Sequence, residues 1–487
     1  MAVAEVEAEM PDVSTSDEAF RIERRGIDYI PESERWAKPR SLFGLWAGAI
    51  TNFEIFIYGA ILMAFFGVTF YQAVIIIVVG NLSYLLLGLT SLQGPDAGTT
   101  TFIVNRAPFG PNGGRLMALF NWLTQVGFET EGLALVVLAG IALAAKAGFS
   151  AGTPMKIVLI IIAAGIQLLL PLFGHGTILK TLKWLAIPFV ALFVILAILT
   201  AGKVHLHGVH PGAGWAQWMA GLAFVIVLSG LGWTENGNDY SRYIPRSASK
   251  SSIVGWVFAG TFIPSILLMT LGAAVGTYVP TLATKNPMPA LPHAFAAWFL
   301  VPFLIVAVVQ LFAINSLDLY SSGVTLQAIG LRLRRWQAVL IDTVIAGGLT
   351  AYAIFSSSFT TLLTDFVDCV IVWIAPWTAI FLVDWVLRRY RYVPGELQRE
   401  KGGLYWRNGG IHWPAIIAQL VGMFASLMGL SQTFFHGLVA SHTGNADFSV
   451  FLGLGVGGLL YAVLAGRSVR REAVEQVRLL EAAPDGS

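Results

Sequence analysis

Acidic side chains stand inside or at the ends of long apolar segments of this 487-residue chain, at Glu54, Glu129, Glu131, Glu235, Asp239, Asp318 and Asp368. A charged group at bilayer depth costs about 2.5–3.5 kcal/mol on insertion scales, so it usually marks a transport path or a coupling site. Glu129, Glu131 and Asp318 are the strongest candidates, because their depth leaves no easy route to solvent. Acids at the segment ends are expected to face water or to pair with loop arginines: Asp239, Asp342, Asp365 and Asp384.

The segments that carry these acids predict an all-α polytopic membrane protein. Hydrophobic residues make up 56% of the chain and charged residues only 12%, against about 25% charged in soluble domains. A membrane span needs about 20 apolar residues. We predict twelve transmembrane helices, near residues 42–66, 72–92, 115–145, 154–173, 182–201, 215–234, 252–278, 296–316, 336–356, 365–387, 413–433 and 447–466.

The basic residues predict how these spans are oriented. With a cytoplasmic N-terminus, only four of the 30 Lys and Arg residues fall outside the cytoplasmic segments, namely Lys146, Lys156, Lys203 and Lys285. The positive-inside rule therefore places both termini in the cytoplasm of a cell (plasma) membrane protein. Residues 1–40 lack an apolar run and are predicted to be a soluble cytoplasmic tail.

Two spans are interrupted by glycine and polar residues. The interrupted stretch of the first span runs from Gly44 to Glu54, and that of the sixth span runs from Ser229 to Asp239. Transporters built from inverted repeats bind substrate between two discontinuous helices of this kind. The separation of five spans predicts a first five-helix repeat at 41–201 and a second at 215–387. A cytoplasmic loop at 388–412, two further helices at 413–466 and a cytoplasmic tail at 467–487 would complete the chain.

Four segments, taken in order, resemble the nucleobase–cation symporter-1 family in its cytosine–purine permease branch. They are Gly26–Arg35, Asn105–Gly110, Asn238–Pro245 and Trp373–Trp385, with weaker matches at Asp318–Ser321 and Tyr405–Ile411. The resemblance spans about residues 26–430. It implies the leucine-transporter architecture and alternating access around a site at the membrane midplane.

The resemblance also implies a substrate site. Its two ring-stacking aromatics fall on Phe128 and Trp233, its first-helix amide on Asn52 and its eighth-helix amide on Asp318. Gly132 stands where the family has a polar side chain, one helical turn after Phe128. With Glu131 and Glu129 beside it, the site is more acidic than the family pattern. Carboxylates accept N–H donors, so the expected ligand presents an amidine-like edge, as in guanine or protonated cytosine, or is a cation.

The same resemblance bears on which ion, sodium or a proton, drives transport. Sodium-coupled proteins of this fold hold the ion with first-helix carbonyls, here those of Gly48 and Thr51, and with eighth-helix hydroxyls. The facing stretch Val308–Ile314 has no hydroxyl. Burial disfavours the charged form of a carboxyl group, so Glu54, Glu129, Glu131 or Asp318 could carry a proton instead. We favour proton over sodium coupling.

The leading interpretation is a symporter that imports a nucleobase or a related heterocycle, such as cytosine or a purine, within a lipid bilayer. An amine or cation carrier, thiamine-like or polyamine-like in its substrate, and a non-transporting membrane sensor are the alternatives. No nucleophile–base pair supports an enzyme, and no nucleic acid, metal or other cofactor is expected. His205, His207 and His210 share a loop that is expected to be solvated. The oligomeric state stays open.

Overall fold

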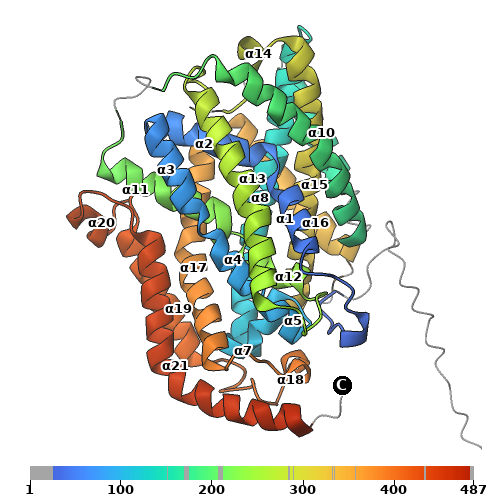
Figure 1. The fold of residues 1–487 in the computed structure, drawn as a ribbon, viewed down its shortest axis with the longest axis vertical. Helices are drawn as coiled ribbons and strands as arrows, with labels where there is room; N and C mark the ends of the chain where they lie inside the picture. The colour runs from blue at the N-terminus through green and yellow to red at the C-terminus, as the bar shows by residue number, and fades with distance from the viewer. Residues whose placement is uncertain are drawn as a thin grey trace, which may run out of the picture.

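The protein is described by a computed structural model that covers residues 26–150, 152–168, 175–206, 212–282, 284, 286–288, 290–331, 333, 335–356, 358–432 and 435–482. His207, His210 and most of the predicted N-terminal tail lie outside these residues. Regular structure within the covered ranges is helical, apart from one isolated bridge between Ser431 and His436. The predicted all-α fold is confirmed (Figure 1).

The first half of the chain contains the elements η1 (Glu32–Glu34), α1 (Ser41–Ile50), α2 (Phe53–Ala64), α3 (Phe70–Asn81), α4 (Tyr84–Thr90), α5 (Gln93–Ala97), α6 (Thr101–Val104), α7 (Arg106–Phe109), α8 (Pro111–Lys146), α9 (Thr153–Gln167) and α10 (His175–Ala201). The second half contains α11 (Trp215–Ile226), η3 (Val227–Leu231), η4 (Thr234–Asn236), α12 (Gly237–Ser241), α13 (Lys250–Gly276), α14 (Leu291–Ala294), α15 (Ala297–Ile329), α16 (Arg335–Phe355), α17 (Phe359–Leu387), α18 (Pro394–Gln398), α19 (Trp413–Gly429), α20 (Leu438–His442) and α21 (Ser449–Ala482).

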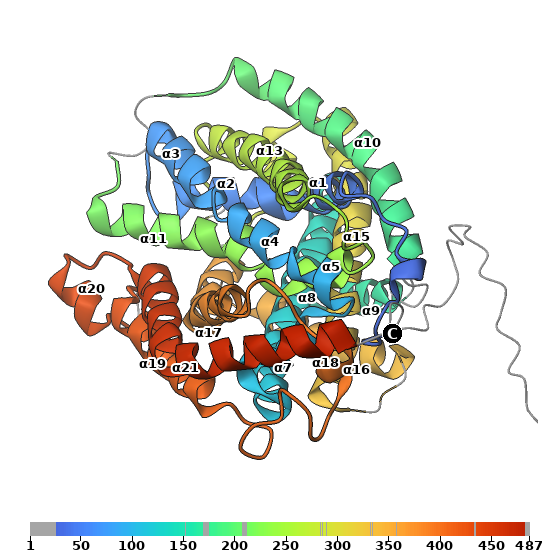
Figure 2. The ribbon, with the colours of Figure 1, turned by 60° about the horizontal axis from the view of Figure 1, so that its bottom comes forward.

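These helices agree with about twelve spans. In the covered ranges, eight helices or helix runs are long and apolar enough to cross a bilayer, and the bent pair α1–α2 adds a ninth. Three shorter apolar helices, Thr153–Gln167, Ile187–Ala201 and Trp413–Gly429, fall within predicted spans. The bundle has α10 along one side and α17, α19 and α21 along the other, as both views show (Figures 1 and 2).

Both spans that were predicted to be interrupted are broken. The chain bends by 53° between α1 and α2. Asn52 caps the new helix there, because its Oδ1 accepts the backbone N–H of Ile55 at 3.0 Å. In the sixth span the break lies at Ser229, whose φ of −105° and ψ of −122° are not helical. Gly230 then passes so close to the Ser83 backbone that any side chain would collide with it.

The two long helices α8 and α15 pack along each other and form the most extensive helix contact in the covered residues. They correspond to the third and the eighth predicted spans, each the third span of its five-helix repeat. Gly132 of α8 permits the close approach, since a Cβ there would meet the Asn315 side chain of α15 at 2.1 Å. The contact places the acids of both helices at the same depth as the two breaks.

Four of the six family-like segments meet at one end of the bundle, which we call the basic end because it holds Arg35, Arg106, Arg242, Arg388 and Arg407. The backbone N–H of His412 donates to the Phe109 carbonyl at 2.9 Å, and Asn112 N–H to the Gly410 carbonyl at 2.8 Å. Arg242 donates to the Gly26 carbonyl at 2.7 Å. Figure 2, which turns this end forward, shows the last turns of α21 crossing it. These segments thus close the end of the bundle instead of forming the central site.

Candidate functional site

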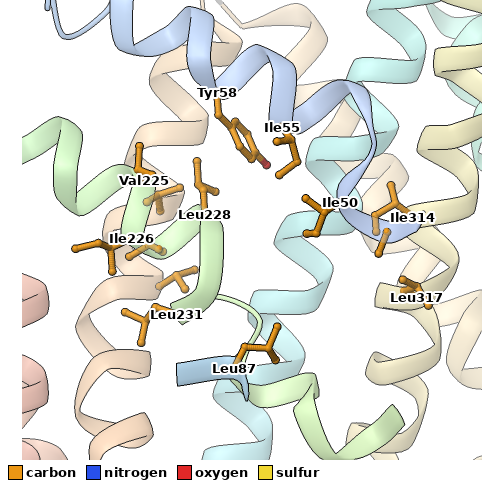
Figure 3. Packing of buried hydrophobic residues seen from close by; sticks show 14 of the residues in the cluster. Ile50, Ile55, Tyr58, Leu87, Val225, Ile226, Leu228, Leu231, Ile314 and Leu317 are labelled. Carbon is orange, nitrogen blue, oxygen red and sulfur yellow. The ribbon is translucent and has the colours of Figure 1, made fainter. Parts of the chain in front are cut away.

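A cavity lies at the centre of the bundle, where the break between α1 and α2 faces η3 and η4. The cavity is narrow in this conformation, with a volume of about 20 Å³. Its lining residues come from both broken spans and from α8 and α15: Asn52, Glu54, Ile55, Tyr58, Phe128, Leu228, Gly232, Trp233, Glu235, Asn236 and Asp318. Figure 3 shows the Tyr58 ring projecting from α2 between Ile55 and Leu228. The two interrupted spans, between which a substrate site was expected, therefore enclose a small cavity.

Three carboxyl groups line this cavity, from three different elements. Glu54 comes from α2, Glu235 from η4 and Asp318 from α15, and the lining residues include no Lys or Arg. Glu54 lies near Glu131 and Asp318, so negative charge on either of them repels negative charge on Glu54. Such a site can accept hydrogen bonds from N–H donors or take up protons, and it repels anions.

Two aromatic side chains contribute flat apolar surface. Phe128 of α8 and Trp233, which lies between η3 and η4, both line the cavity and are half-buried. Each ring is held by an edge contact on another side. Trp233 meets Trp46 with ring centroids 5.6 Å apart, and Phe128 meets Phe366 at 5.2 Å. Glycine is needed at Gly232, since a Cβ there would collide with the Val227 carbonyl oxygen at 2.3 Å but would make only an ordinary contact with the Phe128 ring. The rings are thereby fixed on opposite elements around the same space.

Asn52 lines the cavity but already has local partners. Besides capping α2, its Nδ2 donates to the Ala49 carbonyl at 2.8 Å. The nearby Gly48 carbonyl accepts a hydrogen bond from Nε2 of Gln310 at 2.9 Å. Thr51, the other residue expected to offer a carbonyl to an ion, is the C-cap of α1. The helix break is therefore held together by the protein's own amides.

The remaining predicted residues lie beside the cavity and do not line it. Glu131 accepts a hydrogen bond from Tyr58 at 2.8 Å and faces a second, largely apolar cavity between α8, α16 and α17. Glu129 is fully buried, and neither of its carboxyl oxygens has a partner in the part of the chain that the structure describes. Gly132 is covered by Asn315, whose Nδ2 donates to the Glu129 carbonyl at 3.1 Å. Gly132 thus serves helix packing, which differs from the role expected for it.

Sequence reasoning did not assign four residues of this region to the site: Tyr58, Glu235, Asn236 and Gln310. Gln125 of α8 holds two of them, donating to Asn236 Oδ1 at 3.1 Å and Glu235 Oε1 at 3.3 Å. Glu235 was noted as an acid at the end of the sixth span, and only the break in that span turns it inward. Tyr58 and Gln310 carried no signal, because a single polar residue on an apolar helix does not reveal which face is buried.

A family model described as permease for cytosine/purines, uracil, thiamine, allantoin matches residues 29–453. The chain belongs to this family, the nucleobase–cation symporter-1 proteins. A putative purine-cytosine permease of Bacillus subtilis (strain 168) is 28% identical over 94% of this chain and 99% of its own. A purine-cytosine permease of Emericella nidulans is 25% identical over 91% of this chain and 88% of its own.

Solved structures give the same architecture. Mhp1, a nucleobase-cation-symport-1 family transporter, in a closed conformation with bromovinylhydantoin bound, aligns with a TM-score of 0.73 at 18% identity. The alignment covers 92% of this chain and 96% of Mhp1. Inward-facing Mhp1 aligns with a TM-score of 0.71 at 19% identity, over 93% and 95% of the two chains. The leucine-transporter fold is confirmed, and the protein is a multi-pass membrane permease rather than an enzyme.

Proposed function

We propose that this permease is a secondary-active importer of a nucleobase or a closely related heterocycle, such as cytosine or a purine, and that it works by alternating access. The observation that carries the proposal is the arginine-free, acidic cavity between two broken helices, with Phe128 and Trp233 on its sides. Once alternating access widens the cavity, a flat heterocycle can stack on such rings, each pair contributing about 0.5–1.5 kcal/mol beyond the area it buries. The names of the relatives support the same substrate class.

The carboxyl groups narrow the ligand further. Asp318 replaces an amide of the family pattern, and Glu54 and Glu235 line the same cavity. A carboxylate accepts two parallel N–H bonds but donates none when ionised. We therefore infer that Asp318 binds an amidine-like edge, as in guanine or protonated cytosine. The same acid excess favours a second candidate, an amine or cation carrier on this fold.

We also propose that protons drive uptake, that both termini are cytoplasmic and that the protein resides in the cell membrane. Proton coupling is supported by the buried acids around the cavity, because closely spaced carboxylates in a low dielectric cannot all remain ionised cheaply. The basic end supports the orientation, since Lys and Arg concentrate on the cytoplasmic side of membrane proteins.

A thermal-shift screen of purified protein against purines, pyrimidines, hydantoins, thiamine and polyamines tests the substrate class. Uptake of the stabilising compounds into proteoliposomes, under an imposed pH gradient and with or without sodium, then tests transport. Asp318→Asn should weaken binding or change which ring is preferred. Stabilisation by polyamines and by no nucleobase would replace the leading proposal with the cation carrier. Strict sodium dependence without a response to the pH gradient would reject proton coupling.

A further inference from the structure

The C-terminal end of α1 is a place where a helix stops inside the membrane. The last four carbonyls of a helix have no partner within the helix, and together they carry a partial negative charge. In transporters with broken helices, such carbonyls are a natural site for a coupling cation. A carbonyl that already accepts a hydrogen bond from the protein is less free to bind a cation, so the hydrogen-bond partner of each carbonyl matters.

All four terminal carbonyls of α1 have donors from the protein. The Ala47 carbonyl accepts the backbone N–H of Thr51 at 3.0 Å, and the Ile50 carbonyl accepts that of Asn52 at 2.9 Å. The Ala49 carbonyl accepts the Asn52 side chain at 2.8 Å. The remaining one, Gly48, accepts Nε2 of Gln310 at 2.9 Å. Three of these bonds are local, and only the last comes from a distant helix.

Among the described residues, the bond to the Gly48 carbonyl is the one hydrogen bond that the Gln310 side chain makes. It lies on α15 and is fully buried. Its Oε1 is buried without a partner among the residues that the structure describes. One turn later on the same face of α15 stand Ala313 and Ile314, which offer no oxygen ligand. Figure 3 shows Ile50 and Ile314, which belong to the two elements that the Gln310 bond joins.

This donor set does not fit sodium. The cation would need several oxygen atoms converging on one point, whereas here the Gly48 carbonyl faces an N–H donor and α15 presents two apolar side chains. An ion bound to the Gly48 carbonyl would have to displace Nε2 of Gln310 from it and leave that buried N–H donor without its partner. Burying an unsatisfied polar group costs about 1–3 kcal/mol, which opposes the exchange.

We propose that the side-chain amide of Gln310 takes the place of a coupling cation, tying α15 to the broken end of α1 and making the permease independent of sodium. The inference rests on the proposed transport function for its physiological meaning, but its physical claim concerns ion binding alone. Because the amide is covalently attached, the closure of α1 against α15 does not vary with the sodium concentration outside.

Binding of radioactive sodium to the purified protein tests this claim without any substrate. The wild-type protein should show no saturable binding and no sodium-dependent rise in melting temperature relative to choline, since a ligand that binds the folded state raises it. The triple variant Gln310→Ala, Ala313→Ser, Ile314→Thr frees the Gly48 carbonyl and adds two hydroxyls. It should gain both saturable binding and the sodium-dependent shift.

A matched control is available in Gln419→Ala. Gln419 is also buried, donates its Nε2 to the Trp373 carbonyl at 2.9 Å and leaves its Oε1 unpartnered in the covered residues, but its carbonyl partner belongs to an unbroken helix. This variant should acquire no sodium binding. Saturable sodium binding by the wild-type protein overturns the proposal, as does a folded triple variant that binds none. Because neither readout involves uptake, these outcomes are independent of whether a nucleobase is transported.

Discussion

The hydroxyl of Tyr58 donates a hydrogen bond to Oε1 of Glu131 at 2.8 Å, and this contact separates two cavities. Tyr58 lines the central cavity, whereas Glu131 lines the apolar cavity between α8, α16 and α17. The second carboxyl oxygen of Glu131, Oε2, is buried without a partner in the covered part of the chain. Glu131 is thus reached from the central cavity through one hydroxyl group, and under the proposed proton coupling this pair would control proton movement.

Tyr58→Phe should alter coupling more than binding. The change removes the one donor that the described residues offer to Glu131 and leaves a buried carboxyl group less stabilised in its charged form, with an expected cost of about 1–3 kcal/mol. Uptake into proteoliposomes should change its dependence on external pH, while the affinity for substrate stays close to that of the wild type. Tyr461→Phe is the control, because Tyr461 donates to Asp384 at 2.6 Å far from the cavity. An unchanged pH profile in Tyr58→Phe would remove the pair from the proton path.

Glu131→Gln tests the same path from the other partner. The amide keeps the size of the side chain and can still accept the Tyr58 bond, but it cannot release a proton. Net uptake driven by a pH gradient should be lost, whereas exchange of labelled for unlabelled substrate should persist. Glu475→Gln, on the exposed face of α21, serves as the control for a simple loss of charge. If exchange and net uptake disappear together, Glu131 is needed for binding or folding instead of coupling.

Phe128→Ala and Trp233→Ala should each weaken substrate binding by about 1–3 kcal/mol, the range found when aromatic side chains that stack on bases are removed. Both rings line the cavity from different elements. Phe258→Ala removes a ring that stacks on Phe262 within α13 and should leave affinity unchanged. Isothermal titration with a confirmed substrate gives the comparison. Wild-type affinity in both cavity variants would place the substrate elsewhere.

The broken helices could be predicted from sequence because breaks need particular residues. Asn52 caps a new helix, and Gly230 allows a backbone approach that no side chain would permit. That the third and eighth spans, α8 and α15, are counterparts in the two repeats was also predictable, since both carry acids within an apolar segment, but their direct contact was not. Phe128, Trp233, Asn52 and Asp318, all expected at one site, do line one cavity.

The remaining features depend on contacts between distant segments, which one sequence does not encode visibly. Gly132 was expected to contact the substrate, but the side chain of Asn315, which lies 183 residues later in the sequence, covers this position. Two hydrogen bonds also join segments far apart in the sequence and could not be predicted, the bond from Tyr58 to Glu131 and the bond from Gln310 to Gly48. Order and spacing of the family-like segments identified the family, yet they could not reveal that most of these segments close the basic end.

Glu472→Gln should destabilise the basic end. Glu472 of α21 bonds to Arg407 and to Arg388, and Arg388 is fully buried beside Asp384 at 2.7 Å. Removing one partner from a buried ion-pair network costs about 3–5 kcal/mol. The melting temperature in detergent should fall clearly. In Glu475→Gln, on the same helix, it should barely move, because its pair with Arg478 is exposed and such pairs contribute about 0–1 kcal/mol. Equal shifts in the two variants would mean that the network contributes no more than a surface pair.

His412 should make the same end of the protein sensitive to acid. Burial lowers the pKa of His412 to about 4, and the nearby Arg407 guanidinium lowers it as well. Its Nδ1 lies 2.7 Å from the Pro108 carbonyl. In the unfolded chain the pKa would be about 6.5, so the folded state binds fewer protons between these two values. The stability contributed by neutral His412 is complete above about pH 6.5 and is lost as the pH falls toward 4.

Between pH 7 and pH 5 this linkage predicts a loss of about 2 kcal/mol from His412 alone. His412→Asn keeps an N–H donor for the Pro108 carbonyl and removes the titrating ring. Thermal unfolding at the two pH values should therefore show a smaller decrease in melting temperature in this variant than in the wild type. His442→Asn is the control, because the exposed His442 ring also lies against a backbone carbonyl, that of Leu438 at 2.8 Å. The same decrease in wild type and His412→Asn would show that carboxyl groups, and not His412, govern the acid sensitivity.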